Sequence, residues 1–455
     1  MMRFFKYLTV IQIIMLFLAC SDDSGPGYQE PYIPDPGNGE VPAPQLSDEE
    51  LLDLVQEQTF GYFWEFAESN SGMARERSQD GAYGGISPQL VTTGGSGMGI
   101  ASFPAAVERG WVSRTEAIQR LERILNFLEE APTYHGAFSH WYNGATGQTI
   151  AFSTMDDGGD LVETALLIQG LLINRQYFSG GGEEETTIRE RITALWEAVE
   201  WSWYTNNQDV LFWHWSPNFN FQMNLPIKGW NEALIVYVLA ASSPTYPIEK
   251  QVYDAGWASN GNIVTNRNHY NIQMPLGPSY GGPLFFAHYS FLGLNPNGLV
   301  DQFANYRDQN EAHALIHYNY ALANPKNFEG YGANAWGLTA SDSYEGYSAH
   351  SPTNDLGVIA PTAALSSFPY TPEESMQALR YYYDELGEDL WGPYGFYDAF
   401  SEERNWYADG YLAIDQGPII AMIENYRTGL LWDLFMADEE ILAGLEKLNF
   451  DYNAQ

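Results

Sequence analysis

The sequence is organised around one stretch that joins an acidic loop to an apolar segment, residues 153–164, STMDDGGDLVET. Four acids fall within eight residues, and the following residues, 165–173, are almost wholly apolar. If a helix begins here, Asp156, Asp160 and Glu163 stand at i, i+4 and i+7 and share one face. Because an isolated charge is costly to bury, we expect these acids to face a wet cleft at the start of a buried helix.

Helix capping is the alternative interpretation of the same acids. Asp157 would then be the N-cap and Asp160 would stand three residues further on, where the helix dipole favours a negative charge. Capping accounts for one or two acids and leaves the rest of the cluster unexplained.

On both sides of this stretch, helical segments alternate with loops. Some helices are apolar nearly all round, as buried helices are, whereas others carry charge on one side. About six such alternations predict an all-α fold, an (α/α)6 barrel that forms a single catalytic domain with long active-site loops. The expected helices are 49–69, 98–109, 113–130, 158–176, 184–205, 229–242, 246–258, 281–292, 301–323, 354–367, 372–386, 417–435 and 437–447.

Long loops rich in Gly, Asn, Trp, Tyr and His precede the apolar helices. Loops longer than about 15 residues in a compact domain are usually functional. In a barrel these loops gather at one end, so that end is the predicted active site. They are residues 131–157, 206–228, 259–280, 324–353 and 387–416.

The composition excludes some partners and favours others. Asp and Glu number 58 against 20 Lys and Arg, a net charge of −38, so we expect no nucleic acid partner and no attraction to anionic lipid surfaces. Aromatic residues reach 15 %, with 14 Trp and 31 Tyr. Their flat apolar faces suit stacking on sugar rings, and an aromatic core explains them equally well.

The N-terminus has the pattern of a bacterial lipoprotein signal. Arg3 and Lys6 precede a short apolar run, 7–19, that is too short for a typical membrane span. The only cysteine, Cys20, follows at the position expected for lipidation, although Phe17 departs from the usual aliphatic residue. The alternative is an ordinary signal peptide with an incidental cysteine.

These features divide the chain into three parts. Residues 1–20 are the expected signal peptide, 21–46 a flexible tether rich in Pro and Gly, and 47–455 the catalytic domain. We expect a monomer in the bacterial cell envelope, anchored to the outer membrane only through the lipid, facing the periplasm or the cell surface.

A second acid, Glu232, stands at the start of another apolar helix. A two-carboxylate hydrolase needs one protonated carboxyl to donate to the leaving oxygen and one ionised carboxylate to activate water. The alternative is that Glu232 only stabilises the helix, because a negative charge near the N-terminus interacts favourably with the helix dipole. For Asp415, near Asp398, capping of the helix opened by Gly417 and Pro418 is the favoured interpretation.

Substrate contacts are expected from polar and aromatic side chains in the loops, with core packing as the alternative for each aromatic residue. The candidates are Trp141, Trp213, His214, Trp215, Trp230, Asn231, Trp336 and Asp415.

Other signals are weaker. His313 and His317 lack the Glu of the zinc-protease pattern, since Ala314 follows His313, so we interpret the pair as packing. Residues 94–99, GGSGMG, match neither a phosphate loop nor a nucleophile elbow. The acid cluster has no calcium-loop spacing, and we expect neither a metal nor a cofactor.

Several long motifs carry a family resemblance over residues 49–447. Besides the spacing of Asp156, Asp160 and Glu163, they are GWNEALIVY at 229–237, SSP at 242–244, PLFFAHY at 283–289, WGLTASD at 336–342 and VIAPTAA at 358–364. Together they resemble the glycoamylase-like family, glycoside hydrolase family 144. Trp230 stands where many members have Tyr.

The resemblance implies an (α/α)6 barrel that hydrolyses β-1,2-glucan with inversion at the anomeric carbon. It implies that the essential acids are Asp156, Asp160, Glu163 and Glu232, with Glu232 as general acid and Asp160 and Asp156 as helpers. The expected products are short β-1,2-gluco-oligosaccharides or sophorose. The alternatives are a glucoamylase-type hydrolase of another glucan and a non-catalytic, glycan-binding surface lipoprotein, which the quartet of acids disfavours.

Overall fold

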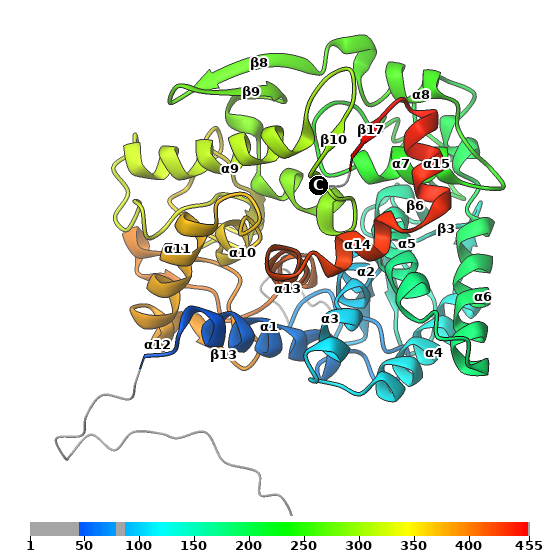
Figure 1. Ribbon diagram of the computed structural model, residues 1–455, viewed down its shortest axis with the longest axis horizontal. Coiled ribbons are helices and arrows are strands. Elements are labelled where there is room, and N and C mark those ends of the chain that lie inside the picture. Colours follow the sequence, from blue (N-terminus) through cyan, green and yellow to red (C-terminus); the bar gives the residue numbers. More distant parts are fainter. Residues whose placement is uncertain (1–44, 79–86, 454–455) are drawn as a thin grey trace, which may run out of the picture. The chain divides into compact units, whose positions relative to one another are not determined.

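Helices dominate the computed structural model, which describes residues 45–78 and 87–453 (Figure 1). Residues from 46 onward belong to one compact unit. The predicted signal peptide, Cys20 and nearly all of the predicted tether lie outside the described residues. Within the described part, none of the helices is both long enough and apolar enough to cross a membrane.

The helices are α1 Asp48–Trp64, α2 Thr93–Ala101, α3 Phe103–Glu108, α4 Arg114–Glu130, α5 Leu161–Tyr177, α6 Glu183–Ala198, α7 Leu234–Ser242, α8 Lys250–Ala255, α9 Tyr306–Ala323, α10 Pro361–Leu365, α11 Pro372–Asp384, α12 Gly387–Leu390, α13 Ala413–Arg427, α14 Leu430–Met436 and α15 Glu439–Lys447. Short 3₁₀ segments also occur, among them η1 Trp201–Thr205, η4 Leu284–Ala287 and η5 Tyr289–Leu292.

The strands are short and pair antiparallel. They are β1 Leu90–Thr92, β2 Thr133–Tyr134, β3 Ala137–Phe138, β4 Trp141–Asn143, β5 Thr149–Ile150, β6 Gly159–Asp160, β7 His214–Trp215, β8 Val264–His269, β9 Ile272–Leu276, β10 Leu299–Val300, β11 Ala340–Ser341, β12 Ser348–Ala349, β13 Trp391–Gly392, β14 Gly395–Phe396, β15 Phe400–Ser401, β16 Trp406–Tyr407 and β17 Asp451–Tyr452. Strands β1, β4 and β5 form one sheet, and the others form two-stranded pairs.

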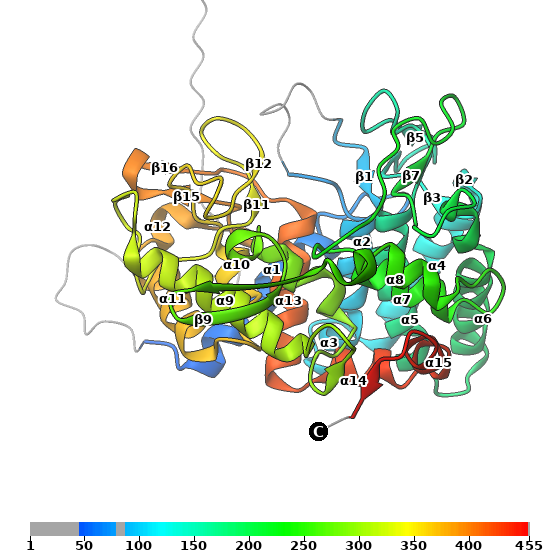
Figure 2. The ribbon, with the colours of Figure 1, turned by 90° about the horizontal axis from the view of Figure 1, so that it is seen from above.

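Inner and outer helices alternate along the chain, which confirms the predicted (α/α)6 barrel. Helices α2, α5, α7, α10 and α13, together with η4 and η5, are almost wholly buried. Outside them lie α4, α6, α9 and α11 (Figure 1). Figure 2 shows β5, β7, β12 and β16 at one end of the helices, where the long loops gather.

Glycines let α2 and α5 touch backbone to backbone. A Cβ at Gly97 would collide with the carbonyl oxygen of Leu166, and one at Gly170 would collide with the carbonyl oxygen of Gly97. Glycine is costly inside a helix, and here the close approach of two buried helices offsets that cost. The run 94–99 is therefore the packing face of α2, which begins at Thr93 and not at the predicted residue 98.

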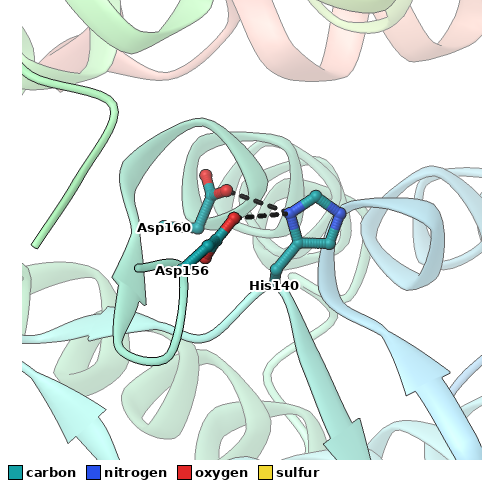
Figure 3. A group of neighbouring side chains, drawn as sticks. All are labelled: His140, Asp156 and Asp160. Carbon is teal, nitrogen blue, oxygen red and sulfur yellow. Dashed lines mark hydrogen bonds and ion pairs between the residues drawn. The ribbon is translucent and has the colours of Figure 1, made fainter. Parts of the chain in front are cut away.

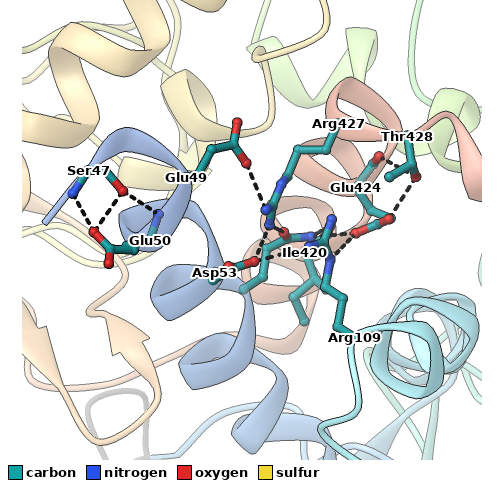
Figure 4. Close-up of polar contacts among 10 residues, drawn as sticks. Ser47, Glu49, Glu50, Asp53, Arg109, Ile420, Glu424, Arg427 and Thr428 are labelled. Atoms are coloured by element: carbon teal, nitrogen blue, oxygen red, sulfur yellow. Dashed lines mark hydrogen bonds and ion pairs between the residues drawn. The ribbon is translucent and has the colours of Figure 1, made fainter.

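Ion pairs fasten the outer helix α1 to the inner helix α13 (Figure 4). A capping box opens α1, because the Ser47 backbone N–H donates to Glu50 Oε2 (2.8 Å) and the Glu50 N–H donates to Ser47 Oγ (3.3 Å). Arg427 at the end of α13 donates to Asp53 (2.6 Å). Arg109 donates to the buried Glu424 (2.6 Å). These contacts join the two ends of the domain.

The helix predicted at 281–292 is instead the pair η4 and η5, and those at 246–258 and 354–367 shrink to α8 and α10. Pro361 is the first residue of α10. Helical geometry is unfavourable for the residue before a proline, so α10 starts later than predicted. The hairpin β8–β9 within the loop 259–280 was not predicted. The packing interpretation of His313 and His317 agrees with their burial, and the Nε2 atoms of both contact the Gly282 carbonyl, at 3.1 and 2.9 Å.

Candidate active site

The site is built at the N-terminal ends of α5 and α7, and a short strand pair leads into α5. Gly159 and Asp160 of β6 pair with Trp215 and His214 of β7. The helix α5 begins at Leu161, later than the predicted residue 158. Asp156 therefore lies in the turn before the helix, and the loop, not helical spacing, brings it beside Asp160.

Asp160 is the N-cap of α5, a correction to the interpretation that placed Asp157 there. Its Oδ1 accepts from the backbone N–H groups of Val162 and Glu163, both at 2.9 Å. Asp157 instead accepts from the Asn218 side chain (2.6 Å). Asp160 Oδ2 accepts from Trp213 Nε1 (3.2 Å). Both oxygens accept hydrogen bonds and the side chain is fully buried. Asp160 therefore links the start of α5 to Trp213.

His140, which the sequence reasoning missed, stands at the centre of the acid cluster (Figure 3). Its Nδ1 lies 3.1 Å from Asp160 Oδ2 and 3.8 Å from Asp156 Oδ2, and its Nε2 lies 3.9 Å from Glu163 Oε1. Burial alone would lower the pKa of His140, but the negative charges of Glu163, Asp160 and Asp156 raise it to about 9. The imidazolium form therefore compensates the buried acids at neutral pH.

Asp156 is buried and incompletely paired. Its Oδ1 has no hydrogen-bond partner among the described residues. Burial, followed by the neighbouring charge of Asp160, raises the pKa of Asp156 to about 7. The ligand atoms of His140, Asp156 and Asp160 lie within 4.8 Å of one another, a spacing that suits a metal ion. An imidazolium cannot ligate a metal, so metal binding and the proton on His140 exclude each other.

Glu163 connects the acid cluster to the packing of α2 against α5. Its Oε2 accepts from the Gly94 backbone N–H (2.7 Å). A Cβ at Gly94 would stand only 2.6 Å from that oxygen, so a glycine is needed for this contact. Burial raises the pKa of Glu163 above its usual range.

Glu232 lies just before α7, which begins at Leu234. The side chain is partly buried. Burial, followed by the charges of Glu163 and Asp160, raises the pKa of Glu232 to about 7. Its backbone carbonyl accepts from Ser290 Oγ, which fixes the start of α7. Glu232 is thus held as a protonated carboxyl up to nearly neutral pH.

Asn231 has a structural contact beside Glu232. Its Oδ1 accepts from the Ala233 backbone N–H (3.0 Å), as in a turn that starts a helix. Its Nδ2 donates to the Lys228 carbonyl (3.5 Å), and the side chain is partly exposed.

A second pair of buried carboxyls, Asp398 and Asp415, lies at the same end of the barrel. The structure corrects the capping interpretation of Asp415, because α13 begins at Ala413 and neither Asp415 carboxylate oxygen accepts from a backbone N–H. Burial and the neighbouring Asp342 raise the pKa of Asp398 to about 7, and burial and Asp398 raise that of Asp415. Both carboxyls therefore keep their protons to a higher pH than ordinary aspartates do.

Tyr289 links the two acid groups. Burial raises the pKa of its hydroxyl, followed by the charges of Asp415, Tyr347, Glu232 and Glu163. Its hydroxyl has no partner in the described residues. The Tyr289 hydroxyl therefore lies within range of the charges of both acid groups.

The predicted sugar platforms divide into two sets. Trp141, Trp213 and Trp215 are partly exposed at the site. Trp230 and Trp336 are buried in the core, and Trp336 Nε1 donates to the Glu374 carbonyl (3.2 Å), which contradicts their expected role as platforms. An aromatic residue fills a core as readily as it lines a cleft, so composition cannot separate the two.

His214 is also a correction, and Phe152 is an addition. The His214 ring is buried against Met223. Phe152 is 50 % exposed and stacks on His140 with ring centroids 4.2 Å apart. It also meets the ring of Trp141 at 4.8 Å. Phe152 and Trp141 thus form an aromatic wall beside the acid cluster.

Comparisons with known proteins identify a family and several relatives of this chain. A family model, Glycoamylase, described as "Putative glucoamylase", matches residues 224–439. The structure is similar to that of an endo-β-1,2-glucanase from Chitinophaga pinensis, solved with sophorotriose and glucose. The two chains are 53 % identical, with a TM-score of 0.88, and the match covers 90 % of this chain and 99 % of that one.

Two further matches come from Parabacteroides distasonis. The structure of a β-1,2-glucanase is 44 % identical, with a TM-score of 0.85, and the match covers 89 % of this chain and 60 % of that one. An exo β-1,2-glucooligosaccharide sophorohydrolase that acts at the non-reducing end is 45 % identical over 425 residues, 89 % of this chain. The chain spans 58 % of the length of that curated relative.

Proposed function

The chain belongs to the glycoamylase-like family, glycoside hydrolase family 144, and on that premise we propose that it is an inverting hydrolase of β-1,2-glucan. The products are short β-1,2-gluco-oligosaccharides or sophorose. The observation that carries the proposal is the protonated Glu232 beside a group of ionisable acids, an arrangement that acid–base hydrolysis of a glycosidic bond needs.

Glu232 is the proton donor in this mechanism. As the bond between the anomeric carbon and the bridging oxygen breaks, the Glu232 carboxyl transfers its proton to that oxygen, which leaves as a hydroxyl group. The raised pKa keeps the proton available near pH 7. Positive charge develops on the sugar ring in the transition state, and the neighbouring carboxylates stabilise it.

Asp156 is the proposed general base. Its unpartnered Oδ1 is free to take a proton from the water that attacks the opposite face of the sugar. His140 holds a positive charge next to Asp156 and favours its ionised form. Asp160 is a positioning residue, since it orients His140 and Trp213 through hydrogen bonds. The negative charge of Glu163 stabilises the imidazolium form of His140 by raising its pKa.

The aromatic wall supports the choice of a sugar substrate. Trp141 and Phe152 offer flat faces beside the acids, and the apolar face of a pyranose ring packs on such surfaces. The proteins of known activity to which this chain is similar are named for β-1,2-glucan or its oligosaccharides. This combination favours β-1,2-glucan over starch.

One set of incubations tests the proposal. The purified protein is mixed with linear β-1,2-glucan, with cyclic β-1,2-glucan and with starch, and the products are separated by chromatography. Proton NMR of the first products reports the anomer, and inversion of a β bond yields the α anomer. Cleavage of starch alone would support the glucoamylase alternative, and glucan binding without cleavage would support the glycan-binding one. Only an endo-acting enzyme opens the cyclic substrate.

We also propose that the protein works in the bacterial cell envelope, as a monomer held at the outer membrane through a lipid on Cys20. The support is the sequence pattern alone: a basic start, a short apolar run and a single cysteine at its end. The Pro- and Gly-rich sequence after Cys20 would let the domain reach a polymer away from the membrane.

A further inference from the structure

We propose that Trp203, resting on His135, forms a second glucan-binding platform outside the cleft, where it holds a part of the polymer distant from the bond that is cleaved. The inference rests on the proposed function, since it takes the ligand to be β-1,2-glucan. Neither residue belongs to the acid cluster or to the predicted substrate contacts.

Trp203 is the most exposed tryptophan of the protein. All 14 tryptophans lie in the described residues, and Trp203, at 43 %, is the only one exposed by more than a third. Single exposed apolar residues are common on protein surfaces. This ring differs because it is fixed: it stacks on the His135 ring with centroids 3.8 Å apart and an interplanar angle of 18°. One face of the ring is thus covered by His135, and the other is presented to solvent.

The support under Trp203 is rigid and strained. His135 and Gly136 form the turn between β2 and β3, both with positive φ, 53° and 74°. Positive φ is unfavourable for a residue with a side chain and persists where the surroundings impose it. The Glu200 N–H donates to the His135 carbonyl (3.0 Å), and His135 Nδ1 lies 3.2 Å from Glu200 Oε2. A Cβ at Gly136 would collide with the Ala198 carbonyl, so the turn is pressed against the end of α6.

The platform continues the aromatic lining of the active site. The edge of Trp215 meets the His135 ring at 5.0 Å and 90°. Trp215 belongs to β7, which pairs with Gly159 and Asp160 of β6. Figure 2 shows β2, β3 and β7 close together at the end that carries the long loops. A run of three rings, Trp215, His135 and Trp203, therefore leads outward from the strand pair that contains Asp160.

This continuity identifies the occupant. A polymer that leaves the cleft along Trp215 meets the exposed face of Trp203 next, and a pyranose ring packs on such a face through its C–H groups. The large negative charge of the protein disfavours acidic partners and leaves an uncharged glucan unaffected. The platform therefore adds binding energy for long chains and not for oligosaccharides that fill only the cleft.

The test compares chain lengths in Trp203→Ala. The measured quantity is the ratio of kcat/KM on long linear β-1,2-glucan to kcat/KM on the shortest β-1,2-oligosaccharide that is cleaved. We expect this ratio to fall about fivefold, through a higher KM on the polymer, because one stacking contact is lost. Trp203→Phe retains a ring and should restore most of the ratio.

Tyr426→Ala is the control. Tyr426 is also an exposed aromatic residue, at 42 %, but it lies near the C-terminal end of α13, whereas Asp415 lies in its first turn. Its removal should leave the ratio unchanged. Fluorescence titration with the polymer supplies an independent readout, since Trp203 is the most exposed tryptophan.

Each outcome decides one question. If the wild type cleaves β-1,2-glucan and Trp203→Ala leaves the ratio unchanged, the platform is wrong and the proposed function stands. A change in oligomeric state with an unchanged ratio would assign Trp203 to a protein contact and overturn the platform. If the wild type cleaves no β-1,2-glucan, the proposed function fails, and the titration alone decides whether Trp203 binds the polymer.

Discussion

Glu232→Gln separates the catalytic interpretation of Glu232 from the capping one. The substitution keeps the shape of the side chain and removes the proton that the mechanism transfers. A general acid contributes roughly 10²- to 10⁴-fold in rate, so turnover of β-1,2-glucan should fall by at least about 100-fold. The same change should stabilise the protein in alkaline solution, because the fold disfavours the ionised form of Glu232.

The stability effect follows from the pKa of Glu232. Burial raises it from an unfolded value of about 4.3 to about 7. A carboxyl with a raised folded pKa destabilises the fold once it ionises, so the penalty is absent below about pH 4 and complete above pH 7. At pH 8 it amounts to roughly 3–4 kcal/mol, at 1.36 kcal/mol for each pH unit between the two pKa values. Gln carries no charge and escapes this penalty.

The assay is thermal unfolding of both proteins at pH 4.5 and pH 8, together with turnover per folded molecule. Glu232→Gln should melt a few degrees above the wild type at pH 8 and close to it at pH 4.5. Glu116→Gln is the control, since Glu116 caps α4 through Ser113 and should lower the melting temperature with turnover unchanged. A Glu232→Gln protein that melts early and keeps wild-type turnover would refute the assignment.

Three further predictions test the base, the helix packing and the lipid. Asp156→Asn should lower turnover at least about 100-fold. In the wild type, kcat/KM should rise as Asp156 ionises near pH 7 and fall as Glu232 loses its proton. A pH profile of kcat/KM for both proteins measures this. Gly97→Ala should destabilise the fold by at least about 1–3 kcal/mol in denaturant unfolding, because its Cβ meets the α5 backbone, whereas Gly387→Ala, with open space around it, should not. Cys20→Ala should move the protein from the membrane fraction to the soluble fraction, and unchanged association would make the cysteine incidental.

The barrel could be predicted because its signal is local. Apolar helices such as 161–173 and amphipathic ones such as 113–130 differ within one or two turns of sequence, and their alternation specifies inner and outer layers. The acids of the site were also found from local sequence, since Asp160, Glu163 and Glu232 all stand at the start of an apolar segment. Helix ends set by proline, as at Pro361, were misplaced by several residues.

The role of each side chain depends on contacts between segments far apart in the chain. Asp160 and Glu232 look alike in sequence, since each precedes an apolar segment. In the fold, the Asp160 carboxylate accepts hydrogen bonds from Trp213, His140 and the helix amides, whereas Glu232 keeps its proton. His140 carried no sequence signal, because its charge exists only where a loop places it among three carboxylates. Trp336 and Trp203 are the same residue type, one in the core and one on the rim. Hydrophobic periodicity is read along the chain, whereas pKa values and exposure arise from burial and Coulomb interactions across it, and only the folded packing supplies those.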